Sequence, residues 1–208
     1  MATNKTAGQG VGSVRYLTVT AMLSAIAFVL MFFDFSIPVL IPNFIKMDLS
    51  DLPALVGSFS LGPLCGVLVC LVKNLLHLTI TSTGGVGELS NFVLGAAFVL
   101  PAGLVYKVKK NRSGALIGSL AGAFVMALIS IPSNYFFVYP FYYNFMSKDM
   151  VLAAYQVIAA GFGFEVKDIL QCLIYFNAPF TFVKGMLSVV VTFLIYKHIS
   201  PVLKGTQR

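Results

Sequence analysis

Leu52–Ile80 reads LPALVGSFSLGPLCGVLVCLVKNLLHLTI, and the way this apolar stretch divides into helices decides the fold. Gly62-Pro63 interrupts the stretch, and proline breaks helices. A single helix would place the basic cluster Lys107–Arg112 outside the cell, whereas two helices, over 52–61 and 63–80, place it inside. Because lysine and arginine concentrate at the cytoplasmic ends of membrane helices, the sequence predicts two helices.

The composition is that of an integral membrane protein. Of the 208 residues, 58% are hydrophobic and only 10% are charged, against about a quarter charged in soluble domains. The mean hydropathy is +0.91. The net charge of +7 does not indicate nucleic-acid binding, because the basic residues flank apolar segments and form no stripe with stacking aromatics.

A helix needs about 20 apolar residues to span a bilayer. Besides the two helices that meet at Gly62-Pro63, the sequence predicts helices over 17–33, 89–106, 114–133 and 178–198. The helix over 52–61 is short, so it crosses only if it tilts or the bilayer thins. We therefore expect one all-α membrane domain over 1–208. It is a six-helix transmembrane bundle with a cytoplasmic tail over 1–16, both termini in the cytoplasm and a ligand site at the extracellular side.

The connecting segments are predicted to lie at the outer face. The segment 34–51 is too polar to cross lipid and long for a connection, so we expect it to form an outer lid loop. Residues 134–145 are aromatic and are expected at headgroup depth, and 150–160 is expected to form an interfacial helix. The last apolar stretch, 168–199, should break or bend near Asn177-Ala178-Pro179.

The charged residues divide between the two ends of these segments. Most lysines and arginines flank the ends predicted to be cytoplasmic. The seven carboxylates flank or fill the polar breaks at the other face: Asp34, Asp48, Asp51, Glu88, Asp149, Glu165 and Asp168. The pattern orients the chain and indicates that the outer loops carry the function.

Ionisable side chains within a bilayer are costly and usually functional. Lys184 lies five residues past Pro179, where it should point into a polar cavity or pair with an acceptor; the alternative is that it snorkels to the outer surface. Glycines such as Gly84 and Gly85 let a backbone approach a ligand closely. We expect these groups to converge with other polar residues on one outward-facing site: Lys46, Asn91, Asn134 and Asn177.

Such a site suits a neutral, flat, partly polar small molecule. The sequence contains no GxxxxGK[ST] phosphate loop and no Ser/His or paired-Asp arrangement at membrane depth, so no enzyme is predicted. No cofactor or metal is predicted either, because the spacing of Cys65, Cys70 and Cys172 fits neither a metal site nor a disulfide framework. A transporter of this kind would take its energy from a partner.

Two stripes of small residues have the spacing that lets helices approach closely. Ala21-x-x-x-Ala25 lies on the first helix, and Gly114-x-x-x-Gly118-x-x-x-Gly122 lies on the fifth. Packing within the bundle explains either stripe, and the sequence does not decide which one faces a partner.

Several stretches resemble the substrate-binding S components of energy-coupling factor (ECF) transporters, and within them the riboflavin-uptake members. The similarity covers nearly the whole chain and is carried by FIKMDLSDLPAL (44–55), Gly62-Pro63, KNLLHL (73–78), GVGELSNF (85–92), and Asn177–Phe180 with Lys184-Gly185. It implies a subunit in the plasma membrane of a prokaryote that binds riboflavin from outside. It also implies docking on a membrane-embedded coupling subunit driven by two cytoplasmic ATPases.

The resemblance further implies which residues act. Polar contacts to the vitamin are expected from Asn134, Asn177, Thr181 and Lys184, and backbone contacts from Gly84 and Gly85. The flat ring would be covered by Phe35, Leu40 and Phe44 of the lid loop. Lys46 and Asp48 would instead hold that loop to the bundle as an ion pair. Docking would use Ala21 and Ala25.

Other hypotheses stay open at this point. The chain could be an S component for a different vitamin, a small membrane enzyme such as a lipid-modifying transferase, or a facilitator that works without ATPases. A scaffold without a ligand is disfavoured by the many amides and lysines at membrane depth. Among flavins, riboflavin is favoured over flavin mononucleotide because the site has few cations to neutralise a phosphate.

Overall fold

The computed structural model describes residues 13–81 and 83–204, with side chains up to residue 195, and every regular element in that part is helical. The longer helices are α1 (Val14–Met31), α3 (Pro63–His77), α4 (Val86–Val108), α5 (Arg112–Ser133) and α9 (Ala178–Lys204). The shorter ones are α2 (Asp51–Leu61), α6 (Tyr139–Tyr142), α7 (Lys148–Gly161) and α8 (Ile169–Cys172). Three further turns complete the chain: η1 (Leu78–Ile80), which is 3-10, and η2 (Asn134–Val138) and η3 (Leu173–Asn177), which are π-helical.

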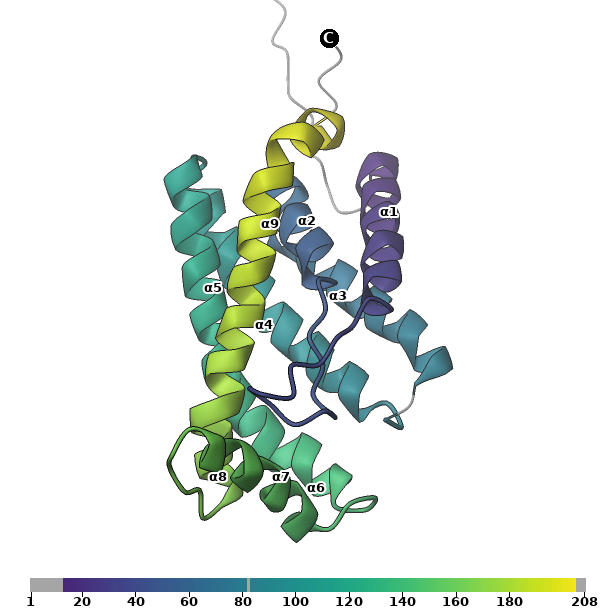
Figure 1. Ribbon diagram of the computed structural model, residues 1–208. Coiled ribbons are helices and arrows are strands. Elements are labelled where there is room, and N and C mark those ends of the chain that lie inside the picture. Colours follow the sequence, from purple (N-terminus) through teal and green to yellow (C-terminus); the bar gives the residue numbers. More distant parts are fainter. Residues whose placement is uncertain (1–12, 82, 205–208) are drawn as a thin grey trace, which may run out of the picture.

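Figure 1 shows the long helices standing side by side, with α6, α7 and α8 gathered at one end. The starts of α1 and α5 and the end of α9 lie at the opposite end. The predicted tail over 1–16 falls mostly outside the described residues, as do both termini, while Arg15 and Tyr16 already belong to α1.

The chain turns sharply between α2 and α3. Gly62 takes φ +104°, a conformation that favours glycine, and Pro63 begins α3, where its missing N–H costs nothing. The two helices then pack closely, since a Cβ on Gly66 would lie 2.8 Å from the carbonyl oxygen of Ala54. With 11 residues, α2 is too short to span a bilayer upright.

The two π segments correct two predictions. The helix expected to end at 133 continues through η2 to Tyr142, and the last helix begins at Ile169 and passes through η3 without a break. In each segment an amide bonds five residues back, Tyr139 to Asn134 and Ala178 to Leu173, and the next residue is a proline. Proline cannot donate and clashes with the preceding turn, so a widened turn lets the helix continue.

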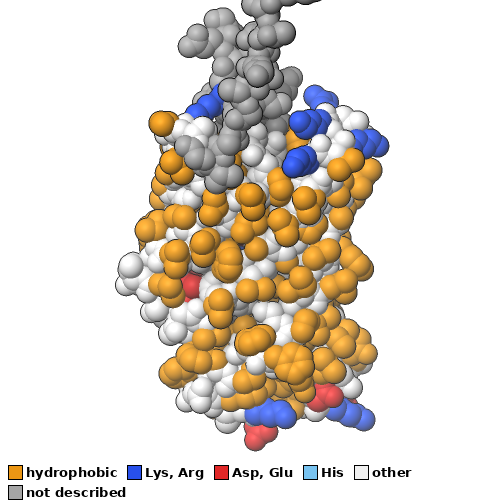
Figure 2. Space-filling view, turned by 180° about the vertical axis from the view of Figure 1, so that it is seen from behind, with side chains coloured by type: hydrophobic (Ala, Val, Ile, Leu, Met, Phe, Trp, Pro, Cys, Tyr) orange, Lys and Arg blue, Asp and Glu red, His pale blue; other side chains and the backbone are white. Residues whose placement is uncertain are grey.

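The described part of the chain contains five helical stretches long and apolar enough to cross a membrane. They are Val14–Met31, Pro63–Ile80, Val86–Val108, Arg112–Tyr142 and Ile169–Ile195. Figure 2 shows that hydrophobic side chains cover the middle of the molecule, while lysine and arginine gather at one end and acidic and basic residues mix at the other. This confirms the predicted all-helical membrane architecture.

The two stripes of small residues have different surroundings in the structure. A Cβ on Gly118 would lie 2.6 Å from the carbonyl oxygen of Ala102, and one on Gly122 would lie 2.2 Å from that of Phe98. The glycine stripe is therefore used where α5 packs on α4. On α1, by contrast, Ala21 and Ala25 are both exposed.

A loop over 32–50 connects α1 to α2 and folds back against the bundle. Phe35 and Met47 pair in a single antiparallel bridge, with N–H to O distances of 2.9 and 2.8 Å between their backbones. Ile41 and Met47 are buried in the cluster formed with η2, α7, α8 and η3, whereas a second cluster fills the space between α1 to α5 and α9. The loop is thus packed into the structure.

Candidate functional site

A cavity of about 260 Å³ lies between the 32–50 loop, the first turns of α4, and the helices that carry η2 and η3. This is close to the lower end of the range for small-molecule sites, about 300–1,000 Å³. Seven of the residues predicted from the sequence line it: Phe44, Lys46, Asn91, Asn134, Asn177, Thr181 and Lys184. The cavity also takes apolar walls from Ile41, Met126 and Phe180.

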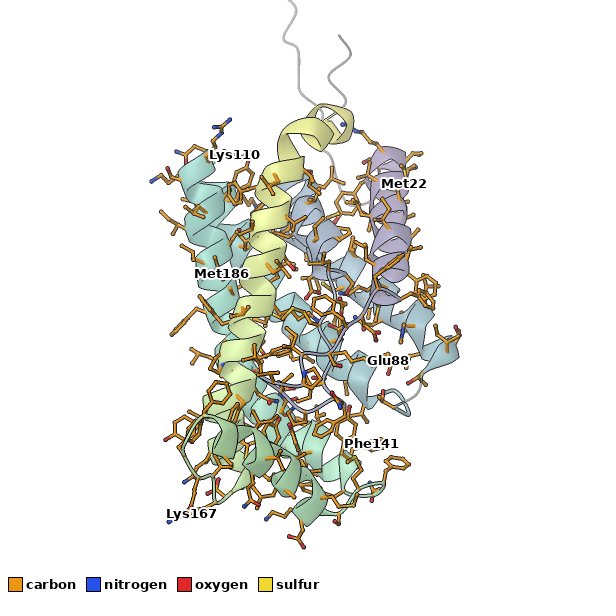
Figure 3. The ribbon with its side chains drawn as sticks, in the orientation of Figure 1. Met22, Glu88, Lys110, Phe141, Lys167 and Met186 are labelled. Carbon is orange, nitrogen blue, oxygen red and sulfur yellow. The ribbon has the colours of Figure 1, made fainter. Side chains whose placement is uncertain are left out.

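The cavity lies away from the basic end of the molecule. In Figure 3, Glu88, which lines the cavity from α4, lies between Lys110 at the basic end and Lys167 at the opposite end, and the lining also includes Val138, Tyr139 and Tyr142 of η2 and α6. The cavity therefore belongs to the half in which α6, α7 and α8 gather.

One helical face supplies three of the polar groups. Asn177 ends η3, and Thr181 and Lys184 follow at the four- and seven-residue spacing that keeps side chains on one side of a helix. All three are buried and line the cavity. Asn134 comes from the other π segment, so both π turns bring an amide to the same space.

Lys184 is held by a carboxylate of the loop. Its Nζ donates to Asp48 Oδ2 at 3.1 Å, which realises the predicted pairing with an acceptor inside a cavity. Burial alone would raise the pKa of Asp48, but Lys184, Lys73 and two hydrogen bonds from Ser50 hold it below its ordinary value. The predicted pair between Lys46 and Asp48 is wrong, because Lys46 Nζ instead contacts Asp34 Oδ2 at 2.8 Å, near the loop's start.

A second buried pair lies next to this one. Lys73 Nζ on α3 donates to Asp51 Oδ1 and to Ser50 Oγ, each at 2.6 Å, and both charged side chains are almost fully buried. The backbone N–H of Ser50 donates in turn to Asp48 Oδ1 at 2.7 Å. A continuous polar chain thus runs from Lys73 to Lys184, and it anchors the end of the loop that meets α2.

The Gly-rich turn between η1 and α4 is organised by Glu88. The carboxylate accepts from Thr81 Oγ1 at 2.9 Å and from Thr83 Oγ1 at 3.0 Å, and its other oxygen lies 2.8 Å from His77 Nδ1. Gly84 and Gly85 have φ values of +61° and +89°. These two glycines close the turn but do not line the cavity, unlike Thr83 and Glu88.

Two loop residues predicted to cover the ligand also lie elsewhere. Phe35 and Leu40 are exposed and do not line the cavity, which takes Ile41, Phe44 and Ile45 from the same loop. An irregular loop has no periodic pattern of inward and outward side chains. The sequence therefore gives no sign that Ile41 lines the cavity while its neighbour Leu40 is exposed.

Asn177 is held by two tyrosines that the sequence analysis did not single out. Tyr155 on α7 donates its O–H to Asn177 Oδ1 at 2.5 Å and lies 2.5 Å from the hydroxyl of Tyr139, while Asn177 Nδ2 donates to Tyr139 at 3.4 Å. All three side chains are buried. Burial and the neighbouring Tyr139 raise the pKa of Tyr155 well above its ordinary value, so its hydroxyl stays protonated.

The site is built for binding. The described residues contain no group of His, Cys, Asp and Glu side chains suited to a metal ion. The cavity combines aromatic and aliphatic walls with a few placed amides, hydroxyls and paired charges, the usual make-up of a small-molecule site. Fold and cavity together are those of a helical membrane protein with a pocket for a small molecule.

Comparison with known proteins identifies the family. The model of the ECF transporter substrate-specific component matches residues 15–196, so the chain belongs to that family of transport proteins and is not an enzyme. It is 35% identical to the riboflavin transporter RibU of Staphylococcus aureus (strain TCH60), over 91% of this chain and 92% of that one. It is 33% identical to the riboflavin transporter FmnP of Bacillus subtilis (strain 168), over 90% and 93%.

A solved structure shows the same fold. It was described as "Structure and mechanism of the S component of a bacterial ECF transporter", and it matches with a TM-score of 0.70 at 34% identity, covering 90% of this chain and 96% of that one. The resemblance seen in the sequence is thereby confirmed at the level of the family and its fold.

Proposed function

We propose that this chain is the riboflavin-binding S component of an ECF transporter in a prokaryotic plasma membrane. The observation that carries the proposal is the cavity, which sets aromatic side chains beside hydrogen-bond donors from two π turns. A fused, flat, uncharged ring with carbonyl groups along one edge matches such a lining. The names of the two relatives support the same vitamin.

The proposal places the cavity at the extracellular side. The end opposite to it carries Lys107, Lys109, Lys110 and Arg112, and the positive-inside rule assigns such an end to the cytoplasm. If α2 crosses the membrane in a tilted position beside α3, it adds a sixth crossing to the five long helical stretches. Both termini are then cytoplasmic. Asn134, Asn177, Thr181 and Lys184 would contact the vitamin, and Phe44 would cover its ring.

Delivery into the cell requires a partner in this proposal. The S component would dock on a membrane-embedded coupling subunit that two cytoplasmic ATPases drive. The exposed face of α1 with Ala21 and Ala25 is the surface we assign to this contact, because the glycine stripe on α5 is already covered by α4.

Titration of riboflavin into flavin-free protein in detergent tests the ligand. Quenching of flavin fluorescence should saturate at about one vitamin per chain. Asn134→Ala and Lys184→Ala should weaken binding at least tenfold, since each removes a polar contact in a desolvated site. Asn144→Ala and Lys167→Ala are matched controls on exposed residues and should bind as wild type. If wild-type protein purifies without flavin and does not quench the fluorescence of added riboflavin, riboflavin is the wrong vitamin.

A further inference from the structure

The contacts among Tyr139, Tyr155 and Asn177 form a closed ring whose direction can be worked out. The O–H of Tyr155 donates to the side-chain oxygen of Asn177 at 2.5 Å, a length that suits O–H···O. The atom facing Tyr155 is therefore the amide oxygen. The amide nitrogen, at 3.4 Å from the hydroxyl oxygen of Tyr139, closes the other side.

Counting hydrogens fixes the rest of the ring. A tyrosine hydroxyl has one hydrogen, and Tyr155 donates its hydrogen to Asn177. In its contact with Tyr139, Tyr155 must then accept, so Tyr139 is the donor. Each hydroxyl gives one bond and receives one, and such chains of hydrogen bonds strengthen one another in a buried setting.

One hydrogen of Asn177 is not used by this ring. An amide NH₂ has two hydrogens, and only one is directed at Tyr139. Asn177 lines the cavity, and no hydrogen bond among the described residues uses its second N–H. Without the two tyrosines, the Asn177 amide could turn over and direct its oxygen, a hydrogen-bond acceptor, into the cavity.

We propose that Tyr155 and Tyr139 are positioning residues that lock the Asn177 amide with its N–H toward the bound molecule. The site then presents a donor at this point and selects ligands with a carbonyl or ring-nitrogen acceptor opposite it. Tyr155 belongs to α7, so this helix beyond the membrane-spanning stretches contributes to ligand choice without touching the ligand. The inference rests on the proposed function.

A double-mutant cycle on riboflavin affinity tests the inference. Tyr155→Phe removes only the hydroxyl and should weaken binding about three- to tenfold, the effect of losing one oriented hydrogen bond. In an Asn177→Ala background the same change should alter the dissociation constant less than twofold, because the group that Tyr155 orients is gone. Tyr175→Phe, an exposed tyrosine in the same π segment, should bind as wild type.

Asn177→Asp gives a second readout. An aspartate keeps an oxygen acceptor for Tyr155 but has no amide N–H, so binding should fall as far as in Asn177→Ala. Equal losses from Tyr155→Phe in both backgrounds, or wild-type affinity in Asn177→Asp, would overturn the positioning role alone. Absence of riboflavin binding to wild-type protein would overturn the ligand, and with it this inference.

Discussion

The buried pair between Lys73 and Asp51 gives the most direct test of how the loop is anchored. Lys73→Met keeps the length and most of the volume of the side chain but removes its charge. Asp51 is then left as a carboxylate inside the bundle, and its Oδ2 already has no hydrogen-bond partner within the described residues. Ser50 loses its contact with Lys73 as well.

The expected cost follows from burial. Removing one partner of a buried ion pair destabilises a protein by about 3–5 kcal/mol, because the remaining charge is desolvated and uncompensated. For a chain of this size that corresponds to a fall in Tm of about 6–20 °C. Lys46→Met breaks the exposed pair with Asp34, whose side chains are 57% and 35% accessible, and should cost about 0–1 kcal/mol.

The three cysteines provide the assay. Cys65, Cys70 and Cys172 are free and buried, so a fluorogenic thiol reagent reports unfolding of the purified protein during a thermal ramp. Lys73→Met combined with Asp51→Leu should recover at least half of the loss, since paired charges can be replaced by apolar residues at little cost. A Tm for Lys73→Met within about 3 °C of that for Lys46→Met would refute the reasoning.

Four further outcomes are expected. The pKa of Asp48 in the folded chain lies below its unfolded value of about 3.9, so the charged carboxylate stabilises the fold at any pH above about 3.9. This stabilisation is lost only as the pH falls through the pKa of the folded chain. The Tm difference between wild type and Asp48→Asn should therefore be the same at about pH 5 and about pH 7. Gly122→Ala should lower the free energy of unfolding by about 1–3 kcal/mol in the same thermal assay, because the Cβ of the new alanine meets Phe98 on α4. Ala25→Leu should leave stability and riboflavin affinity intact and abolish co-purification with a coupling subunit, because Ala25 is exposed on α1. Flavin mononucleotide should bind at least tenfold more weakly than riboflavin in the same titration.

Much of the architecture could be predicted from residue patterns because it depends on local rules. Gly62 takes a positive φ that few other residues adopt, and Pro63 suits the first position of a helix, so the pair ends one helix and starts another. The polar composition of 34–51 likewise excludes it from lipid. The three polar residues Asn177, Thr181 and Lys184 share a face by helical periodicity, which explains why all three line the cavity.

The partners of these side chains could not be predicted in the same way. Lys184 and Asp48 are 136 residues apart, and only the fold determines that Asp48 meets Lys184 while Lys46 turns back to Asp34. The two π turns do leave a signal, namely a proline two residues past each segment, but only Pro179 enters the prediction, where it indicates a break or bend. A widened turn is the alternative when tertiary packing favours a continuous helix.

The pairing of charges around the cavity supports the prediction that riboflavin binds more tightly than flavin mononucleotide. Asp34 contacts Lys46, Asp48 contacts Lys184, and Glu88 contacts His77, so each cation of the lining already has an anion within 3.1 Å. The imidazole cancels a charge only when protonated, which leaves the lining neutral or negative in sum. A phosphate that took Lys184 from Asp48 would leave that carboxylate buried and unpaired, whereas an uncharged vitamin leaves every pair in place.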